Sequence, residues 1–142
     1  MDAIGNATWQ GTWKEGSGTL STSSDTIANK PYSFSSRFEG TPGASPEELL
    51  SVALAGCFNQ ALANNFGMIG LTSESISTSV LIDLGYGDNG HPSIKSAFIT
   101  TDAKCPGIKK EQFDHCVERA RTNCTVAVVL KLDPGITASL LA

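Results

Sequence analysis

The feature that most constrains the fold of this chain is a long segment without charge. Residues 49–69 contain no Asp, Glu, Lys or Arg. Before them, Ser45-Pro46-Glu47-Glu48 predicts a helix start, with a Ser45 N-cap, proline at the first helical position and Glu48 placed to close a capping box. The apolar side chains of the segment point in every direction around a helix: Leu49, Leu50, Val52, Leu54, Phe58, Leu62 and Phe66. Such a helix must be covered on all sides.

The covered helix is predicted to lie in a protein core. Its apolar run falls short of the ~20 residues that a bilayer core requires, because polar residues interrupt it at Asn59, Gln60, Asn64 and Asn65. One small sheet covers one face of such a helix and a second helix covers part of the other. We therefore expect a two-fold symmetric homodimer with the central helices at or near the interface.

The rest of the chain predicts an α+β fold. Between residues 7 and 38, short alternating runs such as Tyr32-Ser33-Phe34 predict a meander of antiparallel strands. Further patterns predict strands over 75–84, 93–102 and 136–141 and a helix over 109–122. At 142 residues, we expect a single domain over 1–142, with antiparallel sheets packed around the long buried central helix.

Composition excludes several classes of partner. The net charge of −4 and the predicted pI near 5.0 give no basic footprint for nucleic acid or an anionic membrane. Residues 1–6 lack the basic stretch and apolar run of a secretory signal, so a cytoplasmic location is expected.

The chain has four cysteines: Cys57, Cys105, Cys116 and Cys124. Cytoplasmic thiols are kept reduced, so a disulfide there is usually catalytic or redox-sensing. The sequence has no C-x-x-C pair and no zinc ligand pattern, and we expect neither a metal nor a cofactor. Taken alone, Cys57 is better explained as a core residue than as a nucleophile, because a free Cys behaves as a small hydrophobe and no Lys or Arg lies between residues 49 and 71.

Three separated motifs change that interpretation. The runs 32–40 (YSFSSRFEG), 45–50 (SPEELL) and 55–58 (AGCF), with a second cysteine at Cys124, resemble the OsmC/Ohr family, specifically its OsmC-like branch. The order and spacing are similar over essentially the full length. The resemblance implies a thiol-dependent peroxidase for organic hydroperoxides, and often for hydrogen peroxide, built as an intertwined α+β dimer with active sites at the interface.

The resemblance also implies roles for single residues. Cys57 matches the peroxidatic cysteine, Cys124 the resolving cysteine, Arg37 the activating arginine and Glu47 the carboxylate that orients it. A permanently charged guanidinium lowers the pKa of a neighbouring thiol. The regenerating partner would be a dithiol reductant, lipoyl or thioredoxin-like, which the sequence does not identify. The remaining cysteines, Cys105 and Cys116, match no motif and are expected to be structural.

The apolar neighbours of Cys57 suggest the substrate class. Leu54 and Phe58 flank it on the helix and are predicted to contact the alkyl group of a hydroperoxide. Leu54 stands where close relatives carry a different residue, which is expected to alter the shape of the pocket.

Helix geometry adds a constraint on this site. Glu47 and Cys57 are ten residues apart, about 15 Å along one straight helix at 1.5 Å per residue. Glu47 and Cys57 of one helix are therefore too far apart to contact the same Arg37 side chain. A site that uses all three therefore takes Glu47, and Arg37 with it, from the other subunit.

The segment after Cys124 departs from the family. The usual Cys-Pro-Val-Ser is Cys124-Thr125-Val126-Ala127 here, so the proline that helps to start a short helix is absent. The β-branched run 125–130 has strand propensity, yet we predict the short helix of the family, because tertiary context commonly overrides that propensity.

Two other functions remain open from the residues alone. The fold could be a non-enzymatic protein that binds an apolar ligand, with the cysteines in the core. It could also be a redox sensor whose Cys57–Cys124 disulfide alters association with a partner.

Overall fold

The computed structural model describes residues 1–131 and 133–142. These residues form two compact units, Met1–Leu49 and Leu50–Ala142. The single domain over residues 1–142 stays a prediction.

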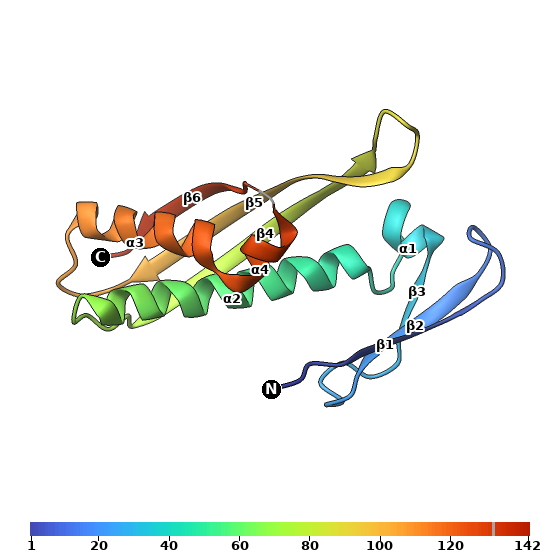
Figure 1. The fold of residues 1–142 in the computed structure, drawn as a ribbon, viewed down its shortest axis with the longest axis horizontal. Helices are drawn as coiled ribbons and strands as arrows, with labels where there is room; N and C mark the ends of the chain where they lie inside the picture. Colours follow the sequence, from blue (N-terminus) through green and yellow to red (C-terminus); the bar gives the residue numbers. More distant parts are fainter. Residues whose placement is uncertain (132) are drawn as a thin grey trace. The chain divides into compact units, whose positions relative to one another are not determined.

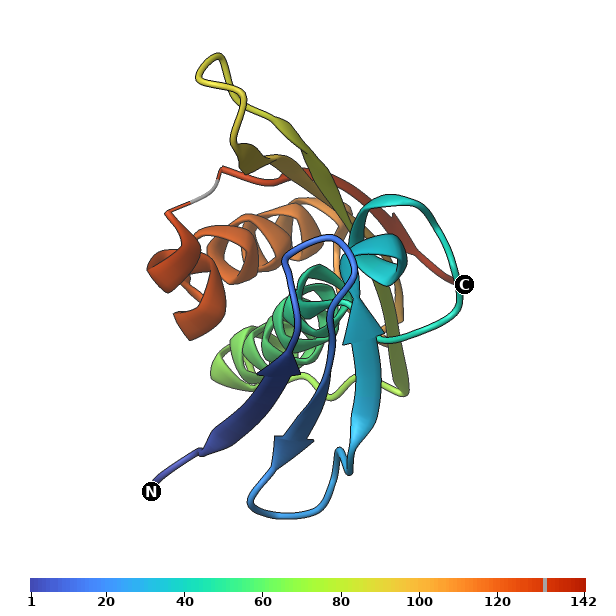
Figure 2. The same cartoon turned by 90° about the vertical axis from the view of Figure 1, so that its right-hand side faces the viewer.

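The first unit is a three-stranded antiparallel sheet with a short helix. Its strands β1 (Gly5–Gln10), β2 (Ser17–Thr22) and β3 (Lys30–Ser33) pair in the order β1-β2-β3 (Figure 2). This confirms the predicted meander, with one correction. The expected strand through Tyr32-Ser33-Phe34 ends at Ser33, and α1 (Phe34–Phe38) follows.

A reciprocal serine cap explains why the chain turns into a helix there. The Ser36 backbone N–H donates to Ser33 Oγ at 3.1 Å, and the Ser33 N–H donates to Ser36 Oγ at 2.9 Å. This capping box has serine at its third position, where Glu or Gln is usual. Alternation of apolar and polar residues continues through Phe34, so the sequence pattern alone missed the end of the strand.

An aromatic pair spans the central strand of this sheet. Gly18 on β2 lies opposite Trp9 on β1 and Tyr32 on β3. The two rings lie with their centroids 5.2 Å apart. A Cβ atom at Gly18 would be 2.7 Å from Tyr32 Cε1 and 2.0 Å from the Thr8 carbonyl oxygen. Only glycine leaves room for this packing.

The second unit is a sheet covered by helices. It contains most of α2 (Pro46–Met68), then β4 (Ser75–Tyr86), β5 (Pro92–Lys104), α3 (Lys110–Asn123), α4 (Thr125–Leu130) and β6 (Gly135–Leu140). Figure 1 shows α2 and α3 along one sheet of order β4-β5-β6. The predicted helix over 125–130 is confirmed by α4.

The strand pairing of this sheet differs in part from the prediction. β4 and β5 are antiparallel, as expected, but β6 pairs with β5 in parallel. A parallel pair requires a crossover. α3 and α4 form that crossover and return the chain along the sheet before β6 begins.

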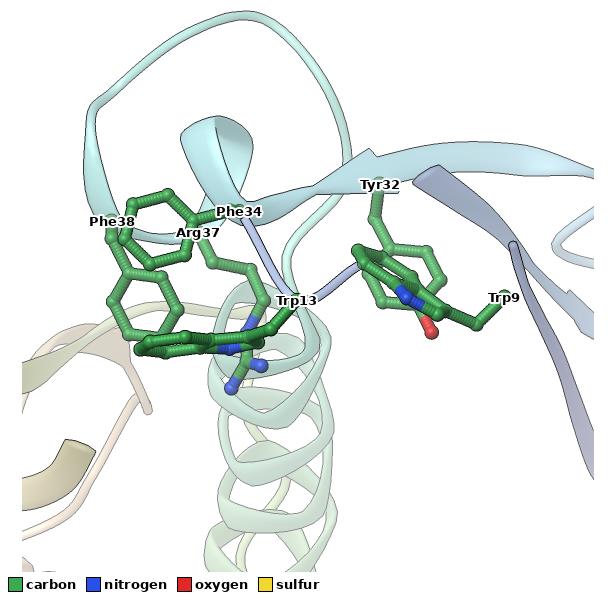
Figure 3. A pocket seen from close by; sticks show the side chains of 6 residues that line it. All are labelled: Trp9, Trp13, Tyr32, Phe34, Arg37 and Phe38. Carbon is green, nitrogen blue, oxygen red and sulfur yellow. The ribbon is translucent and has the colours of Figure 1, made fainter. Parts of the chain in front are cut away.

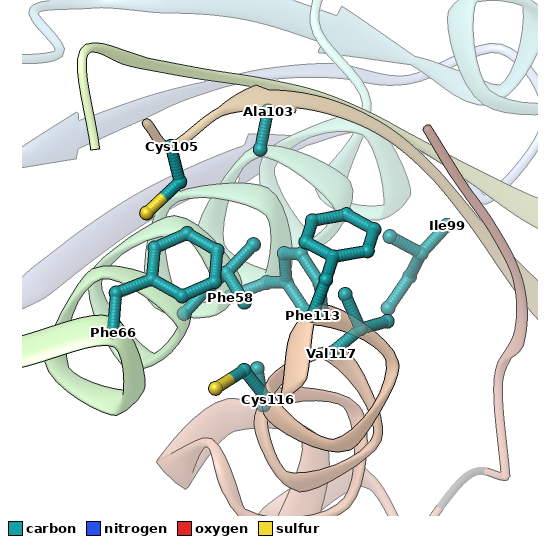
Figure 4. Packing of buried hydrophobic residues seen from close by; sticks show 10 residues of the cluster. Phe58, Phe66, Ile99, Ala103, Cys105, Phe113, Cys116 and Val117 are labelled. Carbon is teal, nitrogen blue, oxygen red and sulfur yellow. The ribbon is translucent and has the colours of Figure 1, made fainter. Parts of the chain in front are cut away.

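The uncharged segment forms α2, and its start follows the predicted cap. The Glu48 backbone N–H donates to Ser45 Oγ at 3.3 Å. Along the helix, a row of side chains four residues apart has no exposed surface: Leu54, Phe58, Leu62 and Phe66. Their partners on β5 alternate along the strand and are also buried: Ala97, Ile99, Thr101 and Ala103. Aromatic packing with α3 completes this core (Figure 4), where the Phe66 and Phe113 rings stack with centroids 6.2 Å apart.

Polar residues of α2 have partners inside the unit. The buried Asn65 amide donates to the Cys116 carbonyl of α3 at 3.0 Å. Asn59 Oδ1 accepts from the Thr78 hydroxyl of β4 at 2.5 Å. These bonds account for amide side chains within an otherwise apolar helix, because a buried polar group without a partner is costly.

One chain does not cover α2 on all sides. On the face away from the sheet, Val52 is 65% exposed and Met68 is 62% exposed. Small residues lie between them on the same exposed face, namely Ala53, Gly56, Ala63 and Gly67. The sequence requirement for full cover is therefore unmet within the single chain. Within the described ranges, no helix is long and apolar enough to cross a membrane.

Gly18→Ala should destabilise the first sheet. The added Cβ overlaps the Thr8 carbonyl and the Tyr32 ring, and overpacking of this kind costs about 1–3 kcal/mol of unfolding free energy. Urea denaturation followed by tryptophan fluorescence measures the loss. Gly5→Ala on β1 is the matched control, because nothing lies within 4 Å of its added Cβ. Equal unfolding free energies for the two variants would contradict the close packing at Gly18.

Candidate active site

Cys57 lies at the edge of the buried face of α2. The residue after it, Phe58, is fully buried, and the residue before it, Gly56, is exposed. Cys57 itself is partly exposed. Its Sγ lies 3.3 Å from Oγ1 of Thr125, the first residue of α4. The thiol predicted as the nucleophile is therefore accessible and contacts the segment that carries the second cysteine.

The thiols of Cys57 and Cys124 have opposite tendencies to ionise. Burial raises the pKa of the Cys57 thiol, but hydrogen bonds from the Thr125 hydroxyl, the Val126 backbone N–H and the Cys124 thiol outweigh it, so the net pKa is lowered. At Cys124, burial dominates and the pKa is raised. Cys124 is only 3% exposed. Cys57 is therefore the thiol of the pair that ionises more readily.

An open cavity of about 450 Å³ lies in front of this pair. Its lining residues are Cys57, Gln60, Ala61, Asn64, Asn123, Cys124 and Thr125. Leu54 and Phe58 are not among them, because both side chains are fully buried against the sheet. Their predicted contact with substrate stays a prediction.

Arg37 and Glu47 form an ion pair within the first unit. Arg37 Nη2 lies 2.5 Å from Glu47 Oε1, and Nε lies 3.3 Å from Oε2. Ser45 Oγ donates to Glu47 Oε2 at 2.8 Å. Burial raises the pKa of Glu47, but the hydrogen bonds from Arg37 and Ser45 outweigh it and lower the pKa below its ordinary value. Glu47 is therefore held ionised, and the two-point contact fixes the plane of the guanidinium.

The helix cap at Ser45 explains part of this geometry. Ser45 accepts from the Glu48 N–H and donates to Glu47, so one hydroxyl both begins α2 and orients the carboxylate. A carboxylate in the first turn of a helix is favoured whatever its function. Here it also holds Arg37.

Aromatic rings surround Arg37. A pocket of about 150 Å³ has six lining residues, which Figure 3 shows: Trp9, Trp13, Tyr32, Phe34, Arg37 and Phe38. The Trp13 and Phe34 rings meet edge to face with centroids 5.0 Å apart. The Arg37 guanidinium lies 4.9 Å from the centre of the Phe38 ring. A cation over an aromatic face is attracted to it, which further restricts the side chain.

Sequence reasoning missed the two tryptophans and Thr125. The run 32–40 already contained three of the aromatic lining residues, and Trp9 and Trp13 were visible as the only tryptophans of the chain. No sequence pattern placed Trp13 beside Phe34, since the contact depends on α1. Thr125 was noted only for the proline that it replaces.

The predicted site residues thus fall into two groups, each described within its own unit. Arg37 and Glu47 belong to Met1–Leu49, and Cys57 and Cys124 belong to Leu50–Ala142. The remaining cysteines, Cys105 and Cys116, lie in the hydrophobic core of the second unit, where burial raises the pKa of each thiol. Among residues 1–131 and 133–142, no cluster of three or more His, Cys, Asp or Glu side chains is placed to hold a metal ion.

Known proteins are similar to this chain in sequence. The family described as OsmC-like protein matches residues 38–139. The chain is 40% identical over 129 residues to "Peroxiredoxin OsmC" of Escherichia coli (strain K12), covering 91% of this chain and 90% of that protein, and matches its Shigella flexneri counterpart equally.

Solved structures support the same α+β fold. The OsmC-like protein from Mycoplasma pneumoniae superposes with a TM-score of 0.74 at 12% identity, covering 100% of this chain and 99% of that one. The organic hydroperoxide resistance protein OhrB of Bacillus subtilis gives 0.68 at 15% identity, covering 97% and 98%. The predicted family and fold class are confirmed, and the chain belongs to the OsmC family.

Proposed function

We propose that this protein is a thiol-dependent peroxidase that reduces organic hydroperoxides, and hydrogen peroxide as a second substrate. The observation that carries the proposal is the environment of the Cys57 thiol. This thiol is accessible, its hydrogen bonds lower its pKa, and a second, buried thiol at Cys124 lies beside it. The name of the E. coli relative, a peroxiredoxin, supports the same chemistry.

The proposed cycle uses both cysteines. The Cys57 thiolate attacks the distal oxygen of the peroxide, the O–O bond breaks, and an alcohol leaves after its oxygen takes up a proton. Cys57 is then a sulfenic acid, which condenses with the Cys124 thiol to form a disulfide and release water. A dithiol reductant, lipoyl or thioredoxin-like, restores both thiols through a mixed disulfide.

Arg37 and Glu47 are assigned to the same site. A guanidinium near Cys57 would stabilise both the thiolate and the negative charge that develops on the departing oxygen. The two-point contact with Glu47 leaves Arg37 oriented before substrate binds. Because the helix rise separates Glu47 and Cys57 by about 15 Å, we assign Arg37 and Glu47 to one subunit and Cys57 and Cys124 to the other.

The proposed assembly is a homodimer through the exposed face of α2. Val52 and Met68 are large apolar side chains left open to solvent by the single chain. The small residues between them, such as Gly56 and Ala63, would let a second helix approach closely. A two-fold axis through this face would cover both helices with one self-complementary surface.

The aromatic pocket at Arg37 favours a second candidate, a protein that binds an apolar ligand without catalysis. Its six lining residues would serve either function. Cys57 separates the two, because a core cysteine resists thiol reagents at neutral pH whereas a thiolate reacts rapidly.

Cys57→Ser should reduce the consumption of cumene hydroperoxide to the uncatalysed rate, because a serine hydroxyl is not ionised at neutral pH. Cys124→Ser should still form a sulfenic acid at Cys57, detected by dimedone and mass spectrometry, but no disulfide. Cys105→Ala is the control and should keep the activity. Persistent turnover in Cys57→Ser would refute the peroxidase and leave ligand binding.

Arg37→Lys should lower kcat/KM for cumene hydroperoxide by roughly 10- to 100-fold, because Lys is a point charge that cannot keep the two-point contact with Glu47. Stopped-flow kinetics measures the effect. Arg119→Lys on α3 is a matched exchange at an exposed position and should change nothing. An unchanged kcat/KM in Arg37→Lys would remove Arg37 from the mechanism.

Mixing two inactive variants should restore activity if the site is shared. In a heterodimer of Cys57→Ser with Arg37→Ala, one site contains both substitutions and the other contains neither. Random exchange of subunits, with half of the dimers mixed, would then return about one quarter of the wild-type rate. A mixture of Cys57→Ser with Cys124→Ser, which belong to the same half of the site, is the control and should stay inactive. No recovery in the first mixture would place the whole site within one chain.

A further inference from the structure

One contact at the candidate site joins α2 to the start of α4. Thr125 Oγ1 lies 3.3 Å from Cys57 Sγ. Thr125 follows Cys124 directly and begins α4, so the hydroxyl reaches the sulfur from the segment that carries the second thiol. The OsmC family usually has proline at this position, and proline offers neither a hydroxyl nor a backbone N–H.

The direction of this hydrogen bond depends on the ionisation of Cys57. Between two neutral groups, either the hydroxyl or the thiol can donate. A thiolate only accepts, so the Thr125 hydroxyl must then be the donor. A hydrogen bond to an ionised acceptor is also stronger than one between neutral groups. The contact therefore stabilises the thiolate more than the thiol.

The other groups that donate to the sulfur belong to the same segment, and they are the Thr125 and Val126 backbone N–H groups and the Cys124 thiol. α2 supplies no charge near the sulfur, because residues 49–69 contain none. The strands that pack beside Cys57 present apolar side chains, Val80 and Ile82 from β4 and Ala97 from β5. Cys124 is the titratable group that faces Cys57 from the α3–α4 junction, and its burial keeps it protonated.

We propose that the Thr125 hydroxyl is a catalytic hydrogen-bond donor that holds Cys57 in its ionised, nucleophilic form. Its importance for turnover rests on the proposed peroxidase function, whereas its effect on Cys57 does not. The hydroxyl keeps its proton throughout the cycle. When the sulfur attacks the distal peroxide oxygen, the O–O bond breaks, the sulfur gives up its negative charge and the hydrogen bond weakens. The departing alkoxide oxygen takes its proton from solvent water, which returns hydroxide to the solvent.

This donor changes which subunit stabilises the Cys57 thiolate. In a site that relies on Arg37 alone, the thiolate depends entirely on the partner subunit. Thr125 supplies part of the stabilisation from within the same chain as Cys57. A monomeric or Arg37-deficient form of this protein should therefore still contain a reactive Cys57.

The test measures the ionisation of Cys57 without peroxide. The wild type and the Thr125→Val, Thr125→Ser and Thr125→Pro variants are alkylated with iodoacetamide from pH 5 to pH 10, and the modified Cys57 peptide is quantified by mass spectrometry. Thr125→Val keeps the size and branching of the side chain but removes the donor. Thr125→Ser keeps the donor.

Thr125→Val should move the midpoint of the rate profile to higher pH and slow alkylation at pH 7 by roughly 3- to 10-fold, with an unchanged plateau at high pH. Thr125→Ser should remain within about twofold of wild type, and Thr125→Pro should slow alkylation at least as much as Thr125→Val. A merely structural role would alter the plateau and leave the midpoint in place. A Thr125→Val profile identical to wild type overturns the proposal.

Peroxide consumption by the same variants distinguishes the hypothesis that Thr125 is the donor to Cys57 from the hypothesis that the protein is a peroxidase. Slower consumption in Thr125→Val, in proportion to its alkylation rate at pH 7, supports the donor role in turnover. A shifted alkylation profile in a protein that consumes no peroxide would refute the peroxidase and still support Thr125 as the donor to Cys57.

Discussion

The packing of one row of α2 side chains against β5 determines much of what this protein can do. Leu54, Phe58, Leu62 and Phe66 repeat every four residues and meet the alternating buried positions of the strand. This contact fixes the rotation of the helix about its own axis. Cys57 precedes Phe58 by one residue, so the same packing that buries the ring places the sulfur at the edge of the core. A rotation of α2 by a single residue would bury the thiol or turn it away from α4.

The two cysteines differ in their surroundings, which shift the pKa values of their thiols in opposite directions. Cys57 is partly exposed and shares a hydrogen bond with Thr125, the residue after Cys124, whereas Cys124 is enclosed among apolar side chains. One segment therefore both supports the thiolate and carries the thiol that would later attack it. This arrangement requires no charged group on α2. Hydrogen bonds from the start of α4 thus lower the pKa of a thiol on an uncharged helix.

The sequence predicted those parts of the structure that depend on local chemistry. The Ser45 cap, the long helix and the amphipathic α3 follow from residue types and their spacing. The residues of α4 have strand propensity, so this helix was predicted only through the resemblance to the family. α1 was missed, because its cap uses Ser36 where the usual capping box has Glu or Gln. The contacts of Trp13 and Thr125 were also missed. Thr125 contacts Cys57, which is distant in the chain, and Trp13 contacts Phe34 of the unpredicted helix α1.

The parallel pairing of β6 has a further consequence for the second thiol. Cys124 lies on the crossover between β5 and β6, outside the ladder of the sheet. The ladder holds its register through backbone hydrogen bonds, and the crossover does not share them. Changes in length or sequence at the α3–α4 junction can therefore move Cys124 relative to Cys57 and leave the sheet intact. The separation of the two sulfurs is thus a property that evolution or protein engineering can adjust independently of the fold.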